Sequence, residues 1–434
     1  MTQRYDTYKD SGVKWLGKIP GHWGTVPFRR IATVKSNLVH PYDYLEFPQV
    51  SPDCIEKDSG RLISWKTVAD SNVESDNHRF YKGQIIYSKI RPLLNKVIIA
   101  PFDGLCSADM YPIETTTDTK YMQYYMLSNL FLSEVRNVTR DRVKMPKINK
   151  EELGQVNIII PPLSEQHSIV SYLDDKCGKI DKMLEGKQKQ VELLAEMKQR
   201  IIADAVTHGL NPNVKMKATN IPWLPEIPEH WEIKPIRAIL RENTEKTETG
   251  DEELLSLSQY TGVSRKKDAT KTGMFEAEST IGYKKVHPGQ FVMNIMLAWN
   301  GSYAVSEYEG IISPAYCVFD FISKDDRIYY HYLWRLSVYQ GAFKTESRGI
   351  IDSRLRLYPN KFLPFPTICP PLEEQQAIVS YITDKTTKID TLTSKLQQEI
   401  ESIKEYKQRL ISDVVTGQIK VPQKSEYLPI SAKN

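Results

Sequence analysis

The sequence predicts an α+β fold with two similar α+β domains joined by two long antiparallel coiled-coil helices in a pseudo-twofold arrangement. Three observations predict it. Residues 161–207 recur 209 positions later with 24 identities, and a tryptophan motif at 15–23 recurs at 223–231. Each copy of the longer segment follows a seven-residue rhythm, and the intervening segments mix short β-type runs with turns. Such a duplication indicates two matched structural frames, each made of the tryptophan motif and the longer repeated segment, that hold different inserts.

The repeated segment predicts a long helix in each half. Apolar residues recur in alternating steps of four and three from Ile169 to Ala205 and from Ile378 to Val414, filling eight of eleven positions in each copy. This is the seam of a coiled coil, and each copy is the natural partner of the other. Because each half runs from the tryptophan motif through an insert to a helix, we expect antiparallel helices, domains at opposite ends and neighbouring chain termini.

Polar residues interrupt this pattern at defined places. The seam lysines that match between the copies are Lys176, Lys198, Lys385 and Lys407. Two interpretations stay open, since a lysine can lie at a solvated seam edge or can select the register of the helices. Gly178 and Gly186 predict a local bend or fraying of the first helix.

Both inserts read as the same α+β domain. Short runs rich in Val, Ile, Phe and Tyr alternate with Gly, Pro, Asp and Asn, and each insert contains one predicted helix, at 121–135 and at 327–340. Gly83-Gln84 matches Gly289-Gln290, which indicates common ancestry. The predicted division of the chain is a first domain at 1–160, a helix at 161–209, a second domain at 210–369, a helix at 370–417 and a tail at 418–434.

Composition excludes several classes of protein. The apolar content is 40%, the charged content is 26%, and the chain contains no run of the ~20 apolar residues that a membrane span needs. No secretory segment opens the sequence. Five scattered cysteines without a C-x-x-C pair predict free, mostly buried thiols, a cytoplasmic location and no metal site. The net charge of +4 permits nucleic-acid binding without requiring it.

Basic, aromatic and amide side chains in the connecting loops are the candidates for DNA contacts, because such side chains reach phosphates and base edges. The alternative for each cluster is solvated surface. The candidates in the first domain are Lys89, Arg91, Arg140, Arg142 and Lys144. The candidates in the second domain are Arg265, Lys266, Lys267, Trp299, Asn300, Arg348 and Arg354.

Catalytic motifs are absent from the sequence. Residues 12–19, GVKWLGKI, fall one position short of a phosphate-binding P-loop, because Ile19 replaces the required Ser or Thr. Asp53 and Asp118 superficially suggest a nuclease carboxylate set, but some 65 residues separate them and the second half has no equivalent. Nothing assembles a nucleophile, a base and an orienting acid, so we expect a non-catalytic chain.

The I-P-x-H-W motif, the P-P-L-x-E-Q start of each long helix and the dissimilar domains between them resemble the specificity subunits of type I restriction-modification systems. The resemblance implies a DNA reader whose two target recognition domains each read one half of an asymmetric split sequence, with the helices as a ruler across the gap. It also implies two adenine-N6 methyltransferase subunits that carry S-adenosylmethionine. In a restriction complex it adds two motor-nuclease subunits that use ATP and Mg²⁺.

Side chains that repeat on the helices are candidates for docking the methyltransferase, with helix-surface ion pairs as the alternative. These residues are Glu165, Gln166, Arg200, Glu374, Gln375 and Arg409. Two other functions stay open, a coiled-coil scaffold that does not read DNA sequence and an enzyme with a degenerate site.

Overall fold

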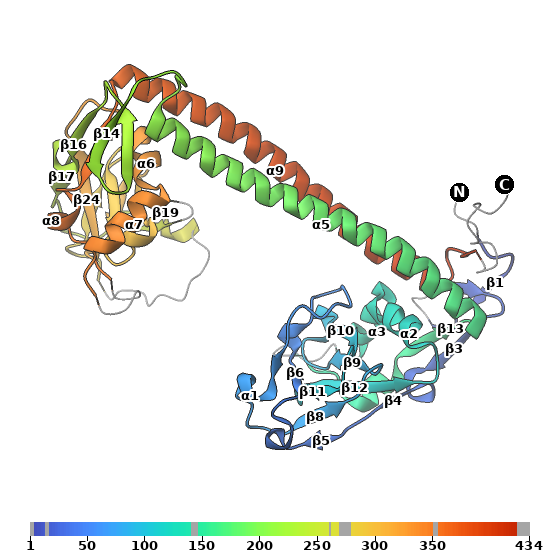
Figure 1. Cartoon of the computed structure of the whole chain (residues 1–434). Helices are drawn as coiled ribbons and strands as arrows, with labels where there is room; N and C mark the ends of the chain where they lie inside the picture. Colours follow the sequence, from blue (N-terminus) through green and yellow to red (C-terminus); the bar gives the residue numbers. More distant parts are fainter. Residues whose placement is uncertain are drawn as a thin grey trace, which may run out of the picture. The chain divides into compact units, whose positions relative to one another are not determined.

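The computed structural model describes residues 4–13, 17–139, 146–259, 262–268, 279–349 and 355–422. The chain forms two compact units (Figure 1). Unit 1 joins residues up to 189 with those from 396 onward, and unit 2 is the continuous stretch 190–395. Each unit therefore contains one α+β domain and one half of each long helix.

The two long helices are α5 (Leu163–His208) and α9 (Leu372–Val415). In unit 1, Asp181 of α5 pairs with Lys407 of α9 at 2.6 Å, and the later Lys187 pairs with the earlier Glu399. In unit 2, Lys198 pairs with Asp390 at 2.7 Å. Residue numbers rise along one helix while they fall along the other, so α5 and α9 are antiparallel, as predicted.

The helices bury the predicted seam where they join the domains, with one correction, and the seam of α5 is half-buried from Ile180 to Ile201. Ile169, Leu173, Ile378 and Ile382 are fully buried in the apolar cores of their units. Lys176 and Lys385 are not seam residues. Cys177 and Thr386 are buried instead, and the two lysines lie over the rings of Tyr172 and Tyr381, one turn earlier on the same helix. A step of four residues followed by one of three, which places Cys177 on the seam, fits the seven-residue rhythm as well as a step of three followed by one of four, which places Lys176 there. The smaller side chain takes the inward position.

The seam lysines Lys198 and Lys407 lie at equivalent places in the two copies, as do their partners Asp390 and Asp181. Each lysine pairs across the helix interface with the aspartate of the other helix. Lys407 is only 12% exposed and Asp181 27%. A cross-helix ion pair forms only when both helices have one alignment, so the structure favours register selection over a solvated seam edge.

Helix α5 is continuous from Leu163 to His208, so the predicted fraying at Gly178 or Gly186 does not occur. Packing and pairing along the helix outweigh the intrinsic weakness of glycine, which costs roughly 1 kcal/mol relative to alanine.

This observation predicts that Gly186→Ala stabilises the protein by about 0.5–1 kcal/mol, because a Cβ at Gly186 would have no atom within 4 Å outside its own helix backbone. Urea denaturation measures the gain, and Gly178→Ala is the matched second site with the same open surroundings. A loss of stability at both positions would contradict the assignment.

The domain of unit 1 contains two principal sheets. The four strands of the first sheet, in spatial order, are β10 (Val97–Ile99), β9 (Ile85–Ser88), β12 (Met110–Thr115) and β4 (Ala32–Val34). The five strands of the second sheet are β5 (Leu38–Val39), β8 (Asn77–Phe80), β11 (Gly104–Cys106), β6 (Pro48–Val50) and β7 (Lys66–Thr67). Two further strand pairs belong to this unit. They are β1 (Tyr8–Asp10) with β2 (Lys18–Pro20) and β3 (Gly24–Pro27) with β13 (Asn157–Ile160). The short helices of this domain are α1 (Val68–Ser71) and α4 (Lys150–Gln155).

The domain of unit 2 repeats this plan. Its four-stranded sheet, in spatial order, contains β17 (Leu240–Asn243), β24 (Tyr316–Phe321), β21 (Phe291–Asn294) and β22 (Tyr303–Val305). Its strand pairs are β14 (Met216–Ile221) with β15 (Leu224–Pro228), β16 (Glu232–Pro235) with β25 (Pro366–Cys369), β18 (Leu255–Ser258) with β19 (Gly262–Arg265), and β20 (Lys284–Val286) with β23 (Gly310–Ile312). Its short helix is α8 (Pro359–Phe362). The predicted α+β class with two long helices is confirmed.

Each predicted domain helix is a pair of helices. In unit 1 these are α2 (Thr119–Leu127) and α3 (Asn129–Val138), and in unit 2 they are α6 (Arg327–Trp334) and α7 (Ser337–Glu346). Ser128 separates the first pair, because its backbone is extended and its hydroxyl accepts from the amide of Phe131. A serine with this geometry is a helix N-cap, so the chain turns there instead of continuing one helix.

The predicted proximity of the terminal segments is confirmed within unit 1, where the Tyr8 hydroxyl donates to the carbonyl of Gly417 at 2.9 Å and the Gln418 side chain donates to the carbonyl of Lys18. The cysteines Cys54, Cys106, Cys177, Cys317 and Cys369 are free thiols, and all but Cys54 are buried. Among the described residues, none forms a helix with the length and apolarity that crossing a membrane requires.

Candidate nucleic-acid interface

The first turn of each long helix fixes the tryptophan motif of its own unit. The carboxylate of Glu165 accepts from the indole N–H of Trp23 at 3.0 Å and pairs with Nε2 of His22. The carboxylate of Glu374 accepts from Trp231 at 3.0 Å and pairs with His230. The same contacts in both units explain why the motif and the glutamate repeat together.

The adjacent glutamines are interior residues. Oε1 of Gln166 accepts from the amide of Asp118, and Oε1 of Gln375 accepts from the amide of Asp326, so each glutamine holds the N-terminus of α2 or α6. Gln166 is 4% exposed and Gln375 is 0% exposed. The prediction that these glutamines dock a partner is therefore wrong, and their repetition reflects the frame. Glu165 and Glu374 are likewise occupied by contacts within their units.

The Gly-Gln turns that precede β9 and β21 also have equivalent structural roles. Oε1 of Gln84 accepts from the amide of Tyr81, and Nε2 donates to Glu114. Gln290 accepts from the amide of His287 and donates to Asp320 in the same way. These contacts fix the starts of two equivalent central strands and hence the loops that follow them.

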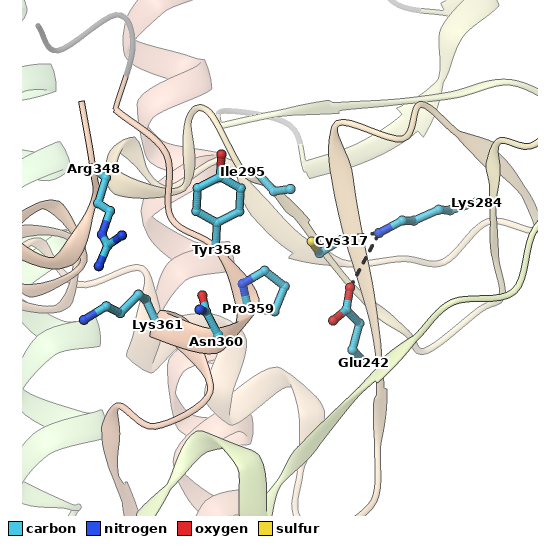
Figure 2. Close-up of a pocket in the computed structure, with 9 residues that line it drawn as sticks. All are labelled: Glu242, Lys284, Ile295, Cys317, Arg348, Tyr358, Pro359, Asn360 and Lys361. Atoms are coloured by element: carbon cyan, nitrogen blue, oxygen red, sulfur yellow. Dashed lines mark hydrogen bonds and ion pairs between the residues drawn. The ribbon is translucent and has the colours of Figure 1, made fainter. Parts of the chain in front are cut away.

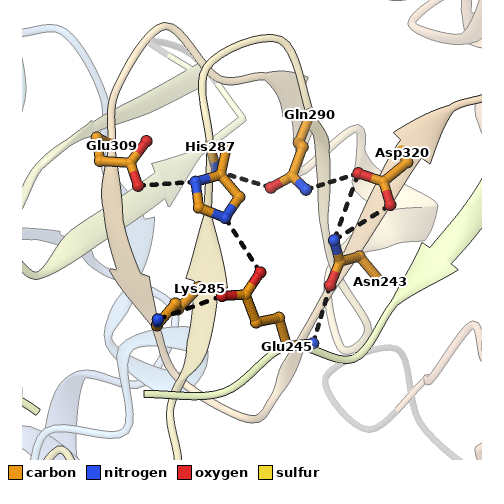
Figure 3. A network of polar contacts seen from close by, with 7 residues as sticks. All are labelled: Asn243, Glu245, Lys285, His287, Gln290, Glu309 and Asp320. Atoms are coloured by element: carbon orange, nitrogen blue, oxygen red, sulfur yellow. Dashed lines mark hydrogen bonds and ion pairs between the residues drawn. The ribbon is translucent and has the colours of Figure 1, made fainter. Parts of the chain in front are cut away.

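In unit 2 this turn belongs to a polar network (Figure 3). His287 lies between Glu309, 2.7 Å from Nδ1, and Glu245, 3.2 Å from Nε2, and Glu245 also pairs with Lys285. The hydrogen bond to Glu245, opposed by partial burial and helped by Glu309, raises the pKa of His287 above 6.5. The contacts from His287 and Lys285 lower the pKa of Glu245 below 4.5.

We therefore expect an NMR titration to give His287 a pKa above 6.5, and Glu245→Gln to move it back toward that value. Because the pKa is raised in the folded state, the stabilisation from charged His287 is fully present below pH 6.5 and is lost as pH rises through the folded pKa. An unchanged His287 pKa in Glu245→Gln would contradict this assignment.

In unit 1 the loop between β9 and β10 contacts the segment that begins at residue 146. The amide of Arg91 donates to the carbonyl of Pro146 at 2.8 Å, and the amide of Ile148 donates to the carbonyl of Lys89 at 2.9 Å. Arg91 is exposed and has a φ of 45°, an uncommon backbone conformation for a residue other than glycine. The loop therefore holds Arg91 beside residue 146, where the run 140–145 ends.

Lys89 is half-buried, with its ammonium 5.3 Å from the ring centre of Tyr111. Burial, together with Lys89 and Lys150, lowers the pKa of the nearby His78. Because this pKa lies below 6.5, His78 is uncharged near neutral pH beside these lysines. Arg140, Arg142 and Lys144 lie outside the described residues.

The equivalent loop of unit 2 lies between β21 and β22. The amide of Leu357 donates to the carbonyl of Ile295 at 2.9 Å, which matches the contact between Ile148 and Lys89. Asn300 is exposed on this loop, and the half-buried Trp299 donates through its indole N–H to the carbonyl of Met296. Two segments far apart in sequence thus meet at the same edge in both domains.

Other predicted residues of unit 2 differ in their surroundings. Arg348 is exposed and pairs with Arg356 through backbone hydrogen bonds. Arg265 and Lys267 both pair with Glu253, at 3.1 and 2.6 Å. Because Glu253 neutralises these two side chains, the structure favours the solvated-surface alternative for that cluster. Lys266 lies between them in the sequence, and no ion pair of its side chain is described. Arg354 lies outside the described residues.

A cavity of about 440 Å³ opens beside Ile295 in unit 2 (Figure 2). Lys284, Arg348 and Lys361 supply positive charge to its walls, and Lys284 pairs with Glu242 at 3.6 Å. Burial raises the pKa of the Cys317 thiol in the wall to about 11, so this thiol is uncharged near neutral pH. We call this space the α8 cavity, because Asn360 and Lys361 of α8 line it.

Comparisons with known proteins agree with this geometry. Residues 24–193 match the model of the type I restriction modification DNA specificity domain. The type I restriction enzyme EcoDI specificity subunit of Escherichia coli is 38% identical over 192 residues, which cover 44% of this chain and 43% of that protein. The MjaVIII specificity subunit of Methanocaldococcus jannaschii is 26% identical over 345 residues, 73% of this chain and 75% of that protein. The chain is thus similar to type I restriction-modification specificity subunits.

The chain also shares its fold with a solved structure. A chain from a study of complex assembly and conformational transition in a type I restriction-modification system superposes with a TM-score of 0.66 at 15% identity, over 92% of this chain and 99% of that chain. The alignment with the E. coli specificity subunit spans less than half of that protein.

Sequence reasoning missed several residues of the second domain. Lys284, Tyr358, Asn360 and Lys361 come to the α8 cavity from a strand, a helix cap and a short helix. No repeat or motif marks them. The one available signal was the charge of Lys284 and Lys361 in segments that otherwise read as strand and loop.

Proposed function

We propose that this chain is the DNA-reading subunit of a type I restriction-modification complex, in which each α+β domain reads one half of an asymmetric, bipartite target. One observation carries the proposal. The frame contacts are the same in both units, whereas the loops that those frames present differ, as Lys89 and Arg91 differ from Ile295 and Leu297. Loops on a rigid scaffold are suited to reading a groove, and different loops read different half-sites.

The proposal extends to partners and cofactors. Two adenine-N6 methyltransferase subunits bind the chain and carry S-adenosylmethionine, and two motor-nuclease subunits that use ATP and Mg²⁺ join them when the system restricts DNA. The chain itself directs this chemistry without performing it. The repeated frame supports two copies of the methyltransferase, because equivalent surfaces can bind equivalent partners.

Genome-wide mapping of adenine methylation tests the function. The chain is co-expressed with the methyltransferase encoded beside it in a host that lacks other adenine methylation, and single-molecule sequencing is compared with the methyltransferase expressed alone. We expect one split, asymmetric motif that requires this chain. A normal complex whose methylation shows no sequence restriction would overturn the proposal in favour of the scaffold.

Arg200 and Arg409 remain the best candidates for methyltransferase docking. They are 85% and 82% exposed and occupy equivalent places on α5 and α9. Each also lies 3.5 Å from an aspartate one turn later on its own helix, Asp204 or Asp413, which keeps the ion-pair alternative open.

We expect Arg200→Glu with Arg409→Glu to weaken assembly with the methyltransferase about tenfold or more, as loss of charged interface contacts does. Analytical ultracentrifugation of the mixed subunits measures this, and Lys179→Glu with Lys388→Glu is the matched control on exposed, repeated ion-paired sites. Unchanged assembly of the arginine variant would assign both residues to helix-surface pairs.

A further inference from the structure

The α8 cavity is a difference between two otherwise equivalent domains. Strand pairing aligns β12 with β24, so that Tyr111 of unit 1 occupies the place of Cys317 in unit 2. Tyr111 is nearly buried and its ring lies under the Lys89 ammonium. The thiol at Cys317 is far smaller than a phenol ring, and Ile295 replaces Lys89, so these two side chains fill less of the space at this place in unit 2.

Charge differs at the same place. The amides of Ile148 and Leu357 make equivalent contacts in the two domains, so α4 of unit 1 corresponds to α8 of unit 2. In this alignment Asn360 and Lys361 correspond to Glu151 and Glu152. The first domain thus presents two carboxylates where the second presents an amide and an ammonium. These two positions therefore disfavour an anion in the first domain and favour one in the second.

The walls of the α8 cavity suit a phosphodiester. Arg348 and Lys361 lie on one side of Tyr358 and Lys284 on the other (Figure 2). Lys284 is only 13% exposed and Lys361 is 40% exposed, with Glu346 at 3.1 Å. Arginine and lysine are the usual phosphate contacts, and Tyr358 and Asn360 add further polar groups. The cavity adjoins Ile295, where the loop that follows β21 begins.

We propose that the α8 cavity binds one backbone phosphate of the DNA strand that the second domain reads, with Arg348 and Lys361 as the phosphate contacts. This inference rests on the proposed function. It assigns the cavity to positioning, because a phosphate contact fixes register on the duplex without specifying a base. The first domain has acidic residues at the equivalent place, so the two half-sites are held by different sets of phosphate contacts.

The test uses the assembled complex with the methyltransferase and a duplex that carries the mapped motif. For Arg348→Gln with Lys361→Gln we expect affinity to fall about tenfold for motif and non-motif duplexes alike, with the slope of log K against log salt smaller by about 1. The methylated motif should stay the same. Lys215→Gln is the matched control, because it removes an exposed lysine paired with Glu229 in the same unit away from the cavity.

Methylphosphonate scanning identifies the phosphate. Neutralising one phosphate near the second half-site should weaken binding to the unaltered complex and have no further effect on the double variant. Full affinity and an unchanged salt slope in a variant with an unchanged melting temperature would overturn the inference. So would tight binding of inorganic phosphate to the cavity with no change in DNA affinity. Absence of any motif in the unaltered complex would instead refute the proposed function.

Discussion

Replacing Gln375 by alanine is expected to lower the free energy of unfolding by about 3 kcal/mol, because three hydrogen bonds of a fully buried side chain are lost together. Oε1 of Gln375 accepts from the amide of Asp326, and Nε2 donates to Asp325 at 2.7 Å and to the carbonyl of Pro370 at 2.8 Å. Alanine leaves the amide and the carbonyl without these partners at the junction of α6 and α9.

Urea denaturation followed by circular dichroism measures this loss, and the equivalent Gln166→Ala gives an internal comparison. Gln166 bonds to the amide of Asp118 and the carbonyl of Pro161 without a carboxylate partner, so a loss of about 2 kcal/mol is expected. Gln188→Ala and Gln397→Ala, at exposed places on α5 and α9, should change stability by less than about 0.5 kcal/mol. Equal effects at buried and exposed glutamines would refute the assignment of Gln166 and Gln375 as interior residues that hold the frame together.

Reversing the charge of Lys407 by the substitution Lys407→Glu is expected to destabilise unit 1 by about 2 kcal/mol, because two carboxylates would then face each other across the mostly buried contact with Asp181. The swapped pair, Lys407→Asp with Asp181→Lys, should regain most of that loss. A double-mutant cycle by urea denaturation separates the pair from its surroundings.

The second unit supplies the control for this experiment. Lys198 and Asp390 form the equivalent pair but are 30% and 59% exposed, so solvent screens them more strongly and Lys198→Glu should cost less than Lys407→Glu. A swapped pair that stays as unstable as the single reversal would show that the lysine matters for something other than its aspartate.

The seam shows how far sequence reasoning reached. The heptad rhythm predicted both helices, because it follows apolar residues over eleven positions in each copy, and the order of segments along the chain predicted their antiparallel pairing. The same rhythm could not choose between Lys176 and Cys177, since either satisfies the spacing. Side-chain size and the neighbouring helix made that choice.

Repetition also marked residues without giving their roles. Glu165 and Gln166 repeat as Glu374 and Gln375, and from this repetition all four were predicted to dock a partner, although the glutamines are interior residues. Identity between copies does not distinguish an interior residue from a partner contact. The bond from Gln166 to Asp118 spans 48 residues of the chain and the bond from Glu165 to Trp23 spans 142, and no local pattern records either.

The candidate site was the least predictable element. Ser128 carried a recognisable cap signal, so the split between α2 and α3 could have been predicted. The α8 cavity could not, because Lys284, Arg348 and Lys361 come from three separate segments and the space between them depends on how those segments pack. Charge in a loop is visible in a sequence, whereas space beside it is not.

The composition of the two units sets an order for folding during synthesis. Unit 2 is one continuous stretch, so all of its contacts are available once residue 395 has left the ribosome. Unit 1 must wait for the end of α9, since the hydroxyl of Tyr121 bonds to the carbonyl of Val415, 294 residues later, and the amide of Asn129 bonds to Ser412. Domains usually fold from the amino terminus onward as translation proceeds. Here the second domain is complete first. Until α9 has been synthesised, the nascent first domain exposes the apolar faces that Leu410 and Val414 later cover. We therefore expect the first domain to need chaperone protection most during this stage.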